Sequence, residues 1–587
     1  MKNGKVVILT LLIGVSAIAM LCTKVEYSAA TLNRFKSYEE LKEFLQRERV
    51  YPYYLYLPYV ESFGLQTPNI MEDLDFSKTN IQVEGVDEAD VVKTDGEYIY
   101  VISGQKVIIV KAYPAEEASV LSRITVNGTL EQLFINADRL VVFYESGLWS
   151  ETKTCINIYD ISDRANPTIK SEIAVDGQYF SSRMIGDYVY VVIRKTALLI
   201  EGEVSLPKIY SEDGCRVIPA TDIYYSNITD SGYIFTTIIT VNIFEDTQKP
   251  KDETILSGWT TCIYVSLENI YLAIGDYDKT VLHRIHIENG EISIAADGEV
   301  TGYVLNQFSM DEYEGYFRIA TTSQMTSFPE KSSPILHLQN NVYILNMDLD
   351  IAGKLEDIAP GEKIHSVRFM GGICYLVTFR KVDPLFVINL SDPYSPKILG
   401  ELEITGYSDY LHVYDESHVI GVGKETVAAE EGDFSWYQGV KISLFDVTDV
   451  TEPKELAKYE IGDRGTDSPV LNDHKAFLFD KEKNLLVIPV SVAEIDESQY
   501  PNGVPPYTYG EIVWQGAYVF TISLELEEKI MLRGTITHIE NGNVHNASNY
   551  VTRALFIGEV LYTISNSKIK MNSLADLSEI KELNLNQ

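Results

Sequence analysis

The chain has 587 residues, and 85 acidic against 48 basic side chains give it a formal net charge of −37. This balance argues against DNA, RNA or an anionic lipid surface as the main partner, because affinity for these polyanions depends on cationic side chains. Hydrophobic residues make up 45% of the chain and charged residues 23%, which excludes a disordered protein and favours a globular one with a substantial core.

The first thirty residues are predicted to direct export. Two lysines precede an apolar run, residues 6–22, and Ser28-Ala29-Ala30 then supplies the small residues that signal peptidases require. We expect cleavage after Ala30 and a secreted or cell-surface protein. The alternative is an uncleaved signal-anchor, in which case residues 6–22 are the only part of the chain that contacts a membrane.

Residues 31–80 are predicted to form a short helical segment followed by an extended Tyr/Pro stretch. Ser37 and Glu40 fit a capping box, and the apolar residues that follow repeat at helical spacing as far as Arg49. The sequence YPYYLYLPYV, residues 51–60, cannot continue a helix because it contains two prolines. We expect it to lie extended over another surface.

From residue 81 to the end, short apolar strands alternate with turns rich in Gly, Asp and Asn. Nine stretches fit a tight hairpin, from VVKTDGEYIYV at 91–101 to LFIGEVLYTIS at 555–565. Each hairpin with the two strands after it makes a four-stranded antiparallel unit, and regular repetition of such units is typical of a β-propeller. We predict an all-β fold, a β-propeller of eight or nine four-stranded blades over residues 81–587, with insertions near 196–230 and 493–515. Several β-sandwich domains are the less favoured alternative, because no linker is visible.

One turn motif recurs with the pattern Asp/Asn, apolar, Ser/Thr, Asp, three residues, Pro. Its instances are DISDRANP at 160–167, NLSDPYSP at 389–396 and DVTDVTEP at 446–453. The paired polar side chains resemble a catalytic pair, but a reaction site is expected once and not at equivalent turns of several blades. We therefore expect these side chains to cap the turn by accepting backbone hydrogen bonds.

Three carboxylates at the start of the first inner strand, Asp87, Glu88 and Asp90, are the best candidates for a cation site. Carboxylates crowded at a channel mouth are typical ligands of hard cations, so the ion would be Ca²⁺. The alternatives are a hydrogen-bonded cap that holds the first blade to the last, or a solvated strand. Arg183 and Arg368 take equivalent positions on inner strands and are candidate contacts for a carboxylate ligand, unless each pairs with a neighbouring acid.

The remaining motifs favour structural roles. Asp473-His474 precedes an inner strand with no nucleophile in sight. His283 and His286 are three residues apart on a predicted strand, so they point to opposite faces and cannot share a metal ion. Cys155 and Cys215 are the pair that we favour for a single disulfide, with buried free thiols as the alternative.

Two long segments resemble a known family. These are DFSKTNIQVEGVDEADVVKTDGEYIYV at 75–101 and DHKAFLFDKEKNLLVIPV at 473–490. Both are similar to the secreted β-propeller family of archaea and bacteria, which is distantly similar to WD40 repeat proteins, and the helix Ser37–Arg49 is similar to the helix that precedes the propeller there. The resemblance covers nearly the whole mature chain. It implies the fold and export but no reaction, because the family is described by its architecture.

The leading functional prediction is a non-enzymatic binding or scaffold protein, outside the cytoplasm, that recognises a protein, peptide or glycan through propeller loops and the channel mouth. The chain contains no GxSxG, HExxH or P-loop motif. The alternative is a secreted hydrolase or lyase with a channel-mouth site assisted by Ca²⁺. Convergent titratable groups at one channel mouth would favour the enzyme, and an exposed aromatic patch would favour binding.

Overall fold

The computed structural model describes residues 32–47 and 75–586, apart from 149–150, 226–232, 247–248, 277, 328–334, 380–382, 430–431 and 433. The predicted export signal and the Tyr/Pro stretch lie outside these residues. Within them, no helix combines the length and the hydrophobicity that a membrane crossing requires.

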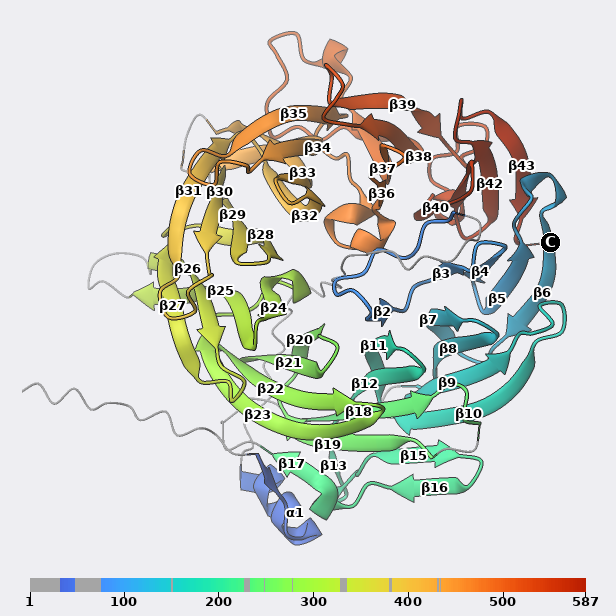
Figure 1. Ribbon diagram of the computed structural model, residues 1–587, viewed down its shortest axis with the longest axis vertical. Helices are drawn as coiled ribbons and strands as arrows, with labels where there is room; N and C mark the ends of the chain where they lie inside the picture. The colour runs from blue at the N-terminus through green and yellow to red at the C-terminus, as the bar shows by residue number, and fades with distance from the viewer. Residues whose placement is uncertain are drawn as a thin grey trace, which may run out of the picture.

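The described residues form nine β-sheets of four or more strands, which stand side by side around a central axis as the blades of a propeller (Figure 1). Seven of these sheets have four strands, and the other two contain the same four-stranded meander with additional strands at their edges. The predicted β-propeller is therefore confirmed. The nine predicted hairpins are the two innermost strands of the nine blades.

Blade 1 is a simple meander, and blades 2 and 3 carry the additional strands. Blade 1 comprises β3 (Val92–Thr94), β4 (Tyr98–Ser103), β5 (Lys106–Lys111) and β6 (Ser119–Thr125). Blade 2 comprises β7 (Thr129–Asn136), β8 (Arg139–Ser146), β9 (Lys153–Asp160) and β10 (Thr168–Asp176), with β15 (Lys208–Ser211) and β16 (Gly214–Val217) outside them. Blade 3 comprises β11 (Gln178–Ile185), β12 (Tyr188–Thr196), β18 (Ile234–Asn242) and β19 (Lys251–Ser257), with β17 (Ile223–Tyr225) and β1 (Asn33–Arg34) outside and β2 (Asp87–Glu88) inside. A small separate hairpin pairs β13 (Leu199–Ile200) with β14 (Glu203–Val204).

The other six blades are simple meanders. Blades 4 and 5 comprise β20 (Thr260–Val265), β21 (Asn269–Asp276), β22 (Lys279–Glu288), β23 (Glu291–Thr301), then β24 (Met310–Tyr313), β25 (Tyr316–Ser327), β26 (Ile335–Leu345) and β27 (Ile351–Ile358). Blades 6 and 7 comprise β28 (Lys363–Met370), β29 (Ile373–Phe379), β30 (Asp383–Asn389), β31 (Lys397–Ile404), then β32 (Tyr407–Asp415), β33 (His418–Ala428), β34 (Ser435–Asp446) and β35 (Lys454–Ile461). Blades 8 and 9 comprise β36 (Leu478–Asp480), β37 (Leu485–Glu494), β38 (Glu511–Ile522), β39 (Ile530–Ile536), then β40 (Arg553–Ile557), β41 (Val560–Ile564), β42 (Lys568–Ser573) and β43 (Glu579–Asn584).

Apolar side chains fill the space between neighbouring blades and hold the ring closed. Strand residues alternate between the two faces of a sheet, so each blade presents Val, Ile, Leu and aromatic side chains to both neighbours. Between the last blade and the first, Ile557 and Tyr562 pack in one cluster with Val92 and Ile99. The last blade thus packs against the first and closes the ring.

The predicted N-terminal helix is α1 (Tyr38–Arg47), which lies outside the ring against blade 3 (Figure 1). The Ser37 hydroxyl accepts a hydrogen bond from the Glu40 amide at 3.1 Å, and the Glu40 carboxylate accepts one from the Lys36 amide at 2.6 Å. These bonds satisfy amides that the first helical turn leaves unpaired. Phe35 stacks on Tyr225 with ring centroids 4.2 Å apart, which fixes the helix to the rim.

The recurring turn motif caps the connection between the third and fourth strands of blades 2, 6 and 7, as predicted. The Asp160 carboxylate accepts hydrogen bonds from the Ser162 amide at 3.0 Å and the Ser162 hydroxyl at 2.7 Å. The glycine that follows each motif is needed for its conformation: Gly406 has φ of +78°, and a Cβ there would lie 2.4 Å from the Lys424 carbonyl oxygen.

The predicted disulfide is wrong. Cys155 on β9 and Cys215 on β16 are separated by the two strands β10 and β15. Three strand spacings of about 4.8 Å place them about 14 Å apart, whereas bridged cysteines have Cα atoms within about 7 Å. Cys155 is a buried free thiol and Cys215 an exposed one.

Candidate functional site

Residues 75–91, which we name the channel segment, run through the centre of the ring before the first blade begins (Figure 1). The sequence had suggested that the acidic run enters the first inner strand, and this prediction is wrong. Asp87 and Glu88 form β2, which pairs antiparallel with Met184 and Arg183 of β11 in blade 3. The first inner strand, β3, starts only at Val92.

The first half of the channel segment bonds to the last three blades. The Ser77 amide donates to the Phe556 carbonyl at 3.0 Å, and the Phe556 amide donates to the Ser77 hydroxyl at 2.8 Å. The Asn80 side-chain amide donates to the His474 carbonyl and to the Tyr410 hydroxyl, both at 3.1 Å. One short stretch thus connects blades 9, 8 and 7.

The second half reaches across to blades 5 and 2. The Gln82 side-chain amide donates to the carbonyl oxygens of Gln307 at 3.0 Å and of Met310 at 3.2 Å. The backbone groups of Asp90 and Leu133 exchange hydrogen bonds of 3.2 and 2.9 Å. Because buried backbone groups require partners, this pattern fixes the depth and direction of the channel segment.

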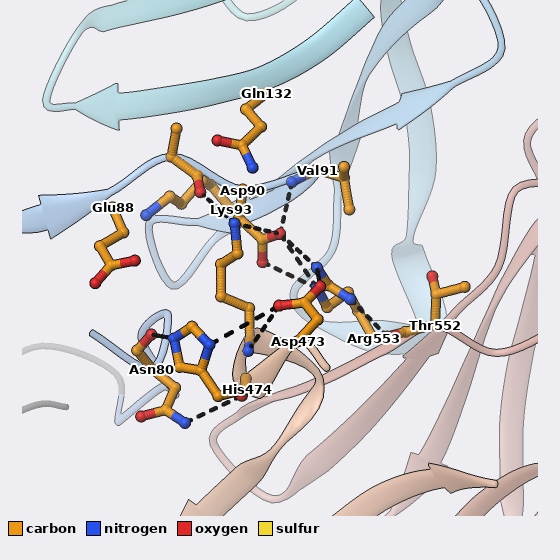
Figure 2. Close-up of polar contacts among 12 residues, drawn as sticks. Asn80, Glu88, Asp90, Val91, Lys93, Gln132, Asp473, His474, Thr552 and Arg553 are labelled. Carbon is orange, nitrogen blue, oxygen red and sulfur yellow. Dashed lines mark hydrogen bonds and ion pairs between the residues drawn. The ribbon is translucent and has the colours of Figure 1, made fainter. Parts of the chain in front are cut away.

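A buried arginine joins the channel segment to the last two blades (Figure 2). Arg553, the first residue of β40, contacts both carboxylate oxygens of Asp90 at distances of 2.9 to 3.2 Å. Its Nη2 also donates to Asp473 at 2.5 Å. Lys475 donates to the Ala89 carbonyl at 2.9 Å. This arrangement is a hydrogen-bonded cap, the alternative to a cation site that the sequence left open, but it joins the last two blades to the channel segment and not to the first blade.

Burial controls the titration of this cluster. Burial opposes ionisation of Asp90, but Arg553 and then Lys475 hold the pKa of its carboxyl below the ordinary value. Burial raises the pKa of Glu88, whose nearest cation, Arg183, is 3.6 Å away, beyond hydrogen-bond distance. Burial lowers the pKa of His474 well below its usual range, and the nearby cations lower it further. His474 is therefore neutral, and its Nε2 lies 3.0 Å from the Asn80 carbonyl.

The three carboxylates of the predicted cation site do not converge on one point. Asp87 lies 2.7 Å from Lys93, Glu88 faces Arg183, and Asp90 is held by the arginine described above. Across the described ranges, no three His, Cys, Asp or Glu side chains are grouped so that they could hold a metal ion. The structure supports the hydrogen-bonded cap, and Ca²⁺ at these residues stays a prediction.

The two arginines predicted as ligand contacts differ from each other. Arg183 follows the expectation that a buried charge is paired, because it faces Glu88 and donates to the Gln307 side chain at 2.8 Å. Arg368 does not follow it. Its guanidinium lies over the Phe308 ring, 5.2 Å from the centroid, and makes no hydrogen bond or ion pair with any described residue.

A second region, at the rim, carries exposed aromatic side chains. They come from the start of β34 and from the loop between β37 and β38, which is the predicted insertion at 493–515. This loop projects beyond the ring near β35 and β39 (Figure 1). We name the aromatic patch by its members: the exposed rings of Phe434, Tyr437, Tyr507 and Tyr509, and the half-buried ring of Trp436.

A buried arginine supports the aromatic patch from beneath. Arg464, which is 4% exposed, has its guanidinium carbon 4.0 Å from the Tyr437 ring centroid and 4.3 Å from that of Tyr509. It donates to the Tyr437 carbonyl at 2.8 Å and to the Tyr509 hydroxyl at 3.1 Å, and the two tyrosine hydroxyls bond to each other. Tyr507 packs edge-on against Trp436 and is 58% exposed. The rings are therefore held in place while their faces stay accessible.

The aromatic patch was not predicted from the sequence. Its two halves, SWYQ at 435–438 and PPYTYG at 505–510, are about seventy residues apart, and only the pairing of blades 7 and 8 brings them together. The available signal was an insertion with two tyrosines next to prolines, a composition that suits an exposed, preformed loop.

Comparison with known proteins agrees with this architecture. A family model described as beta propeller domain matches residues 76–577. The chain belongs to this beta propeller domain family. A relative from Methanocaldococcus jannaschii, the uncharacterized protein MJ1554, is 29% identical over 582 residues, which cover 84% of this chain and 81% of the relative. An uncharacterized protein from Archaeoglobus fulgidus is 28% identical over 506 residues, 70% of this chain and 75% of the relative. The family thus supplies the fold, and the function has to be argued from the site.

Proposed function

We propose that this propeller is an exported, non-enzymatic binding protein of the cell surface or extracellular space, which recognises a protein, peptide or glycan through the aromatic patch. The observation that carries the proposal is a set of rigid rings held in an exposed position. Large aromatic side chains exposed together at one place are uncommon on monomers unless they bind a partner. Rings fixed in advance also lose little conformational entropy when a ligand stacks on them.

The channel cluster does not support the hydrolase or lyase alternative. Its titratable groups converge, which was the expected mark of an enzyme, but Asp90, His474 and Arg553 are only 3%, 2% and 8% exposed. Arg553 is engaged with Asp90 and Asp473, and Nε2 of His474 with the channel segment. Groups that are buried and ion-paired stabilise a fold, whereas a catalytic site needs access for its substrate.

Ligand capture tests the binding proposal. We would apply the mature protein to glycan and peptide arrays and to a surface extract of the organism that encodes it. Trp436→Ala and Tyr507→Ala should lose the captured ligand. Tyr394→Ala is the matched control, because Tyr394 is 70% exposed but belongs to a turn of blade 6. Capture that survives both patch substitutions, or that the control abolishes equally, would contradict a role of the patch.

Export is tested separately by N-terminal sequencing of the native protein. The proposal expects a mature chain that starts at Thr31, after the small residues of the signal. A native chain that starts at Met1 would show the uncleaved anchor, and recovery of that chain in the cytoplasmic fraction would reject export altogether.

A further inference from the structure

Arg368 is a buried cation without a partner among the described residues. It lies on β28, the innermost strand of blade 6, and is 5% exposed. Its contact with the Phe308 ring is the interaction that the structure records for the guanidinium, and its Nε is fully enclosed without a hydrogen bond. The Nε–H, one of the five donors of the guanidinium, is thus buried without an acceptor, which is unfavourable for a charged group.

Other buried cations around the channel are balanced by acids. Lys93, Arg183 and Arg318 each lie within 4 Å of their own carboxylate, while Arg553 and Lys475 lie within 4 Å of carboxylates that Arg553 shares. The acids that face these five are Asp87, Glu88, Asp311, Asp90 and Asp473. Arg368, unlike these five, has no carboxylate within 4 Å among the described residues.

The surroundings of Arg368 offer a further unpaired donor. Phe308, the ring beneath the guanidinium, belongs to the 3-10 helix η4 (Gln307–Ser309), which contacts β28. The Ser309 hydroxyl on the same short helix is also fully enclosed and has no hydrogen-bond partner among the described residues. Burial lowers the pKa of Arg368 below its ordinary value, with smaller opposing effects of Tyr410 and Asp311. The nearby polar groups thus do not neutralise the charge.

We propose that Arg368 binds a small monovalent anion in the wall of the channel beside η4. The ligand chemistry is that of chloride or of a simple carboxylate such as formate. A bound anion would supply both the charge and the hydrogen-bond acceptors that the protein does not provide there. A guanidinium binds a carboxylate with two parallel hydrogen bonds, and it binds chloride with a single charge-assisted contact. This site is separate from the aromatic patch and does not depend on the proposed function.

The test measures thermal unfolding of the full mature chain at constant ionic strength. Sodium isethionate, whose anion is bulky, is replaced stepwise by sodium chloride in one arm and by sodium formate in the other. The wild type should show a saturable rise of the melting temperature in at least one arm, since a ligand that binds only the native state stabilises it. Arg368→Gln should weaken the apparent affinity by about tenfold or more.

Arg318→Gln is the matched control, because Arg318 is also buried but has its own carboxylate, Asp311. This variant should be less stable and should keep the anion response. If Arg368→Gln does not fold, broadening of the ³⁵Cl magnetic resonance line by the wild type, reversed by formate, replaces the comparison. A wild type without saturable stabilisation or line broadening would overturn the proposal. An equal response of all three proteins would also overturn it, because the effect would then be that of salt on the whole surface.

Discussion

Two buried arginines illustrate the difference between the channel and the rim. Arg553 in the channel sits between Asp90 and Asp473, so its charge is neutralised and it joins blade 9 to the channel segment and to the turn before blade 8. Arg464 at the rim lies beneath the rings of Tyr437 and Tyr509 and donates only to neutral oxygens. The first contact fixes how distant parts of the chain meet, and the second fixes the orientation of side chains that face solvent.

The contacts of Arg553 stabilise the fold, whereas the exposed rings above Arg464 are available for binding. A buried ion pair is strongly destabilising when one partner is removed, because the other charge stays buried. An exposed ring contributes little to the fold, so its removal costs little stability. We therefore expect substitutions in the channel to change the free energy of unfolding, and substitutions in the aromatic patch to change ligand capture.

Removal of the last blade should destabilise the fold more than any other change considered below. A chain that ends at residue 545 lacks β40 to β43 and exposes the apolar face of the first blade, including Val92 and Ile99. It also leaves Asp90 without Arg553. We expect aggregation, measured by size-exclusion chromatography with light scattering, because exposed sheet edges and apolar faces associate. A monomer with the full-length melting temperature would show that the ring does not need this blade.

Arg553→Ala should come next, with a loss of about 3 to 5 kcal/mol in the free energy of unfolding, since two carboxylates lose their buried partner. Arg553→Lys keeps the charge but not the fork of two parallel bonds, so an intermediate loss is expected. Denaturant titration measures both. A loss below about 1 kcal/mol for Arg553→Ala would place this arginine in the same class as a surface ion pair.

His283 shows how a buried imidazole without a hydrogen-bond partner among the described residues should change the pH dependence of the unfolding free energy. It is fully buried on β22, neither ring nitrogen has a hydrogen bond with a described residue, and burial lowers its pKa to about 4. Above about pH 6.5 the imidazole is neutral in both states and contributes no pH dependence. As the pH falls below that value, only the unfolded state takes up the proton, so stability falls by about 1.4 kcal/mol per pH unit.

This decline should end near pH 4, where the folded state also takes up the proton. His283→Leu should remove that share of the slope between about pH 6.5 and pH 4, whatever its effect at neutral pH. Denaturant unfolding at several pH values gives the two slopes. Parallel curves for the wild type and the variant would mean that this imidazole is not held neutral.

Tyr507→Ala should affect ligand capture and leave the stability of the fold nearly unchanged. Because the side chain is 58% exposed, we expect a change within about 0.5 kcal/mol in unfolding free energy. Ligand capture should nevertheless be lost if the proposed function is right. A large loss of stability instead would show that the aromatic patch is part of the core of blades 7 and 8.

Addition or removal of Ca²⁺ is expected to change the melting temperature least. Asp87, Glu88 and Asp90 face cations of the protein itself, so millimolar Ca²⁺ or a chelator should leave the melting temperature unchanged. A chelator-sensitive melt that the double substitution Asp87→Asn and Asp90→Asn abolishes would restore the cation site. It would then show that the channel cluster binds a ligand as well as holding the ring together.

Local sequence was sufficient for the repeating parts of the fold. Hairpins such as 91–101 and capping turns such as 160–167 are determined by residues a few positions apart, and both were predicted correctly. Contacts between blades were not accessible in this way. Asp90 and Arg553 are 463 residues apart, and nothing in either neighbourhood specifies the other. The missing partner of Arg368 is of the same kind, because pairing rules predict that a buried charge has a partner but not where it comes from.

The channel segment also has a consequence for the order of assembly. It precedes the propeller in the chain, yet its partners extend from Leu133 to Phe556. Its contacts with Phe556 and Arg553 therefore form only after the last blade has been synthesised and has docked. Contacts between residues so far apart in sequence make folding slow. A segment that is synthesised before every blade is thus fully secured only when the ring is complete.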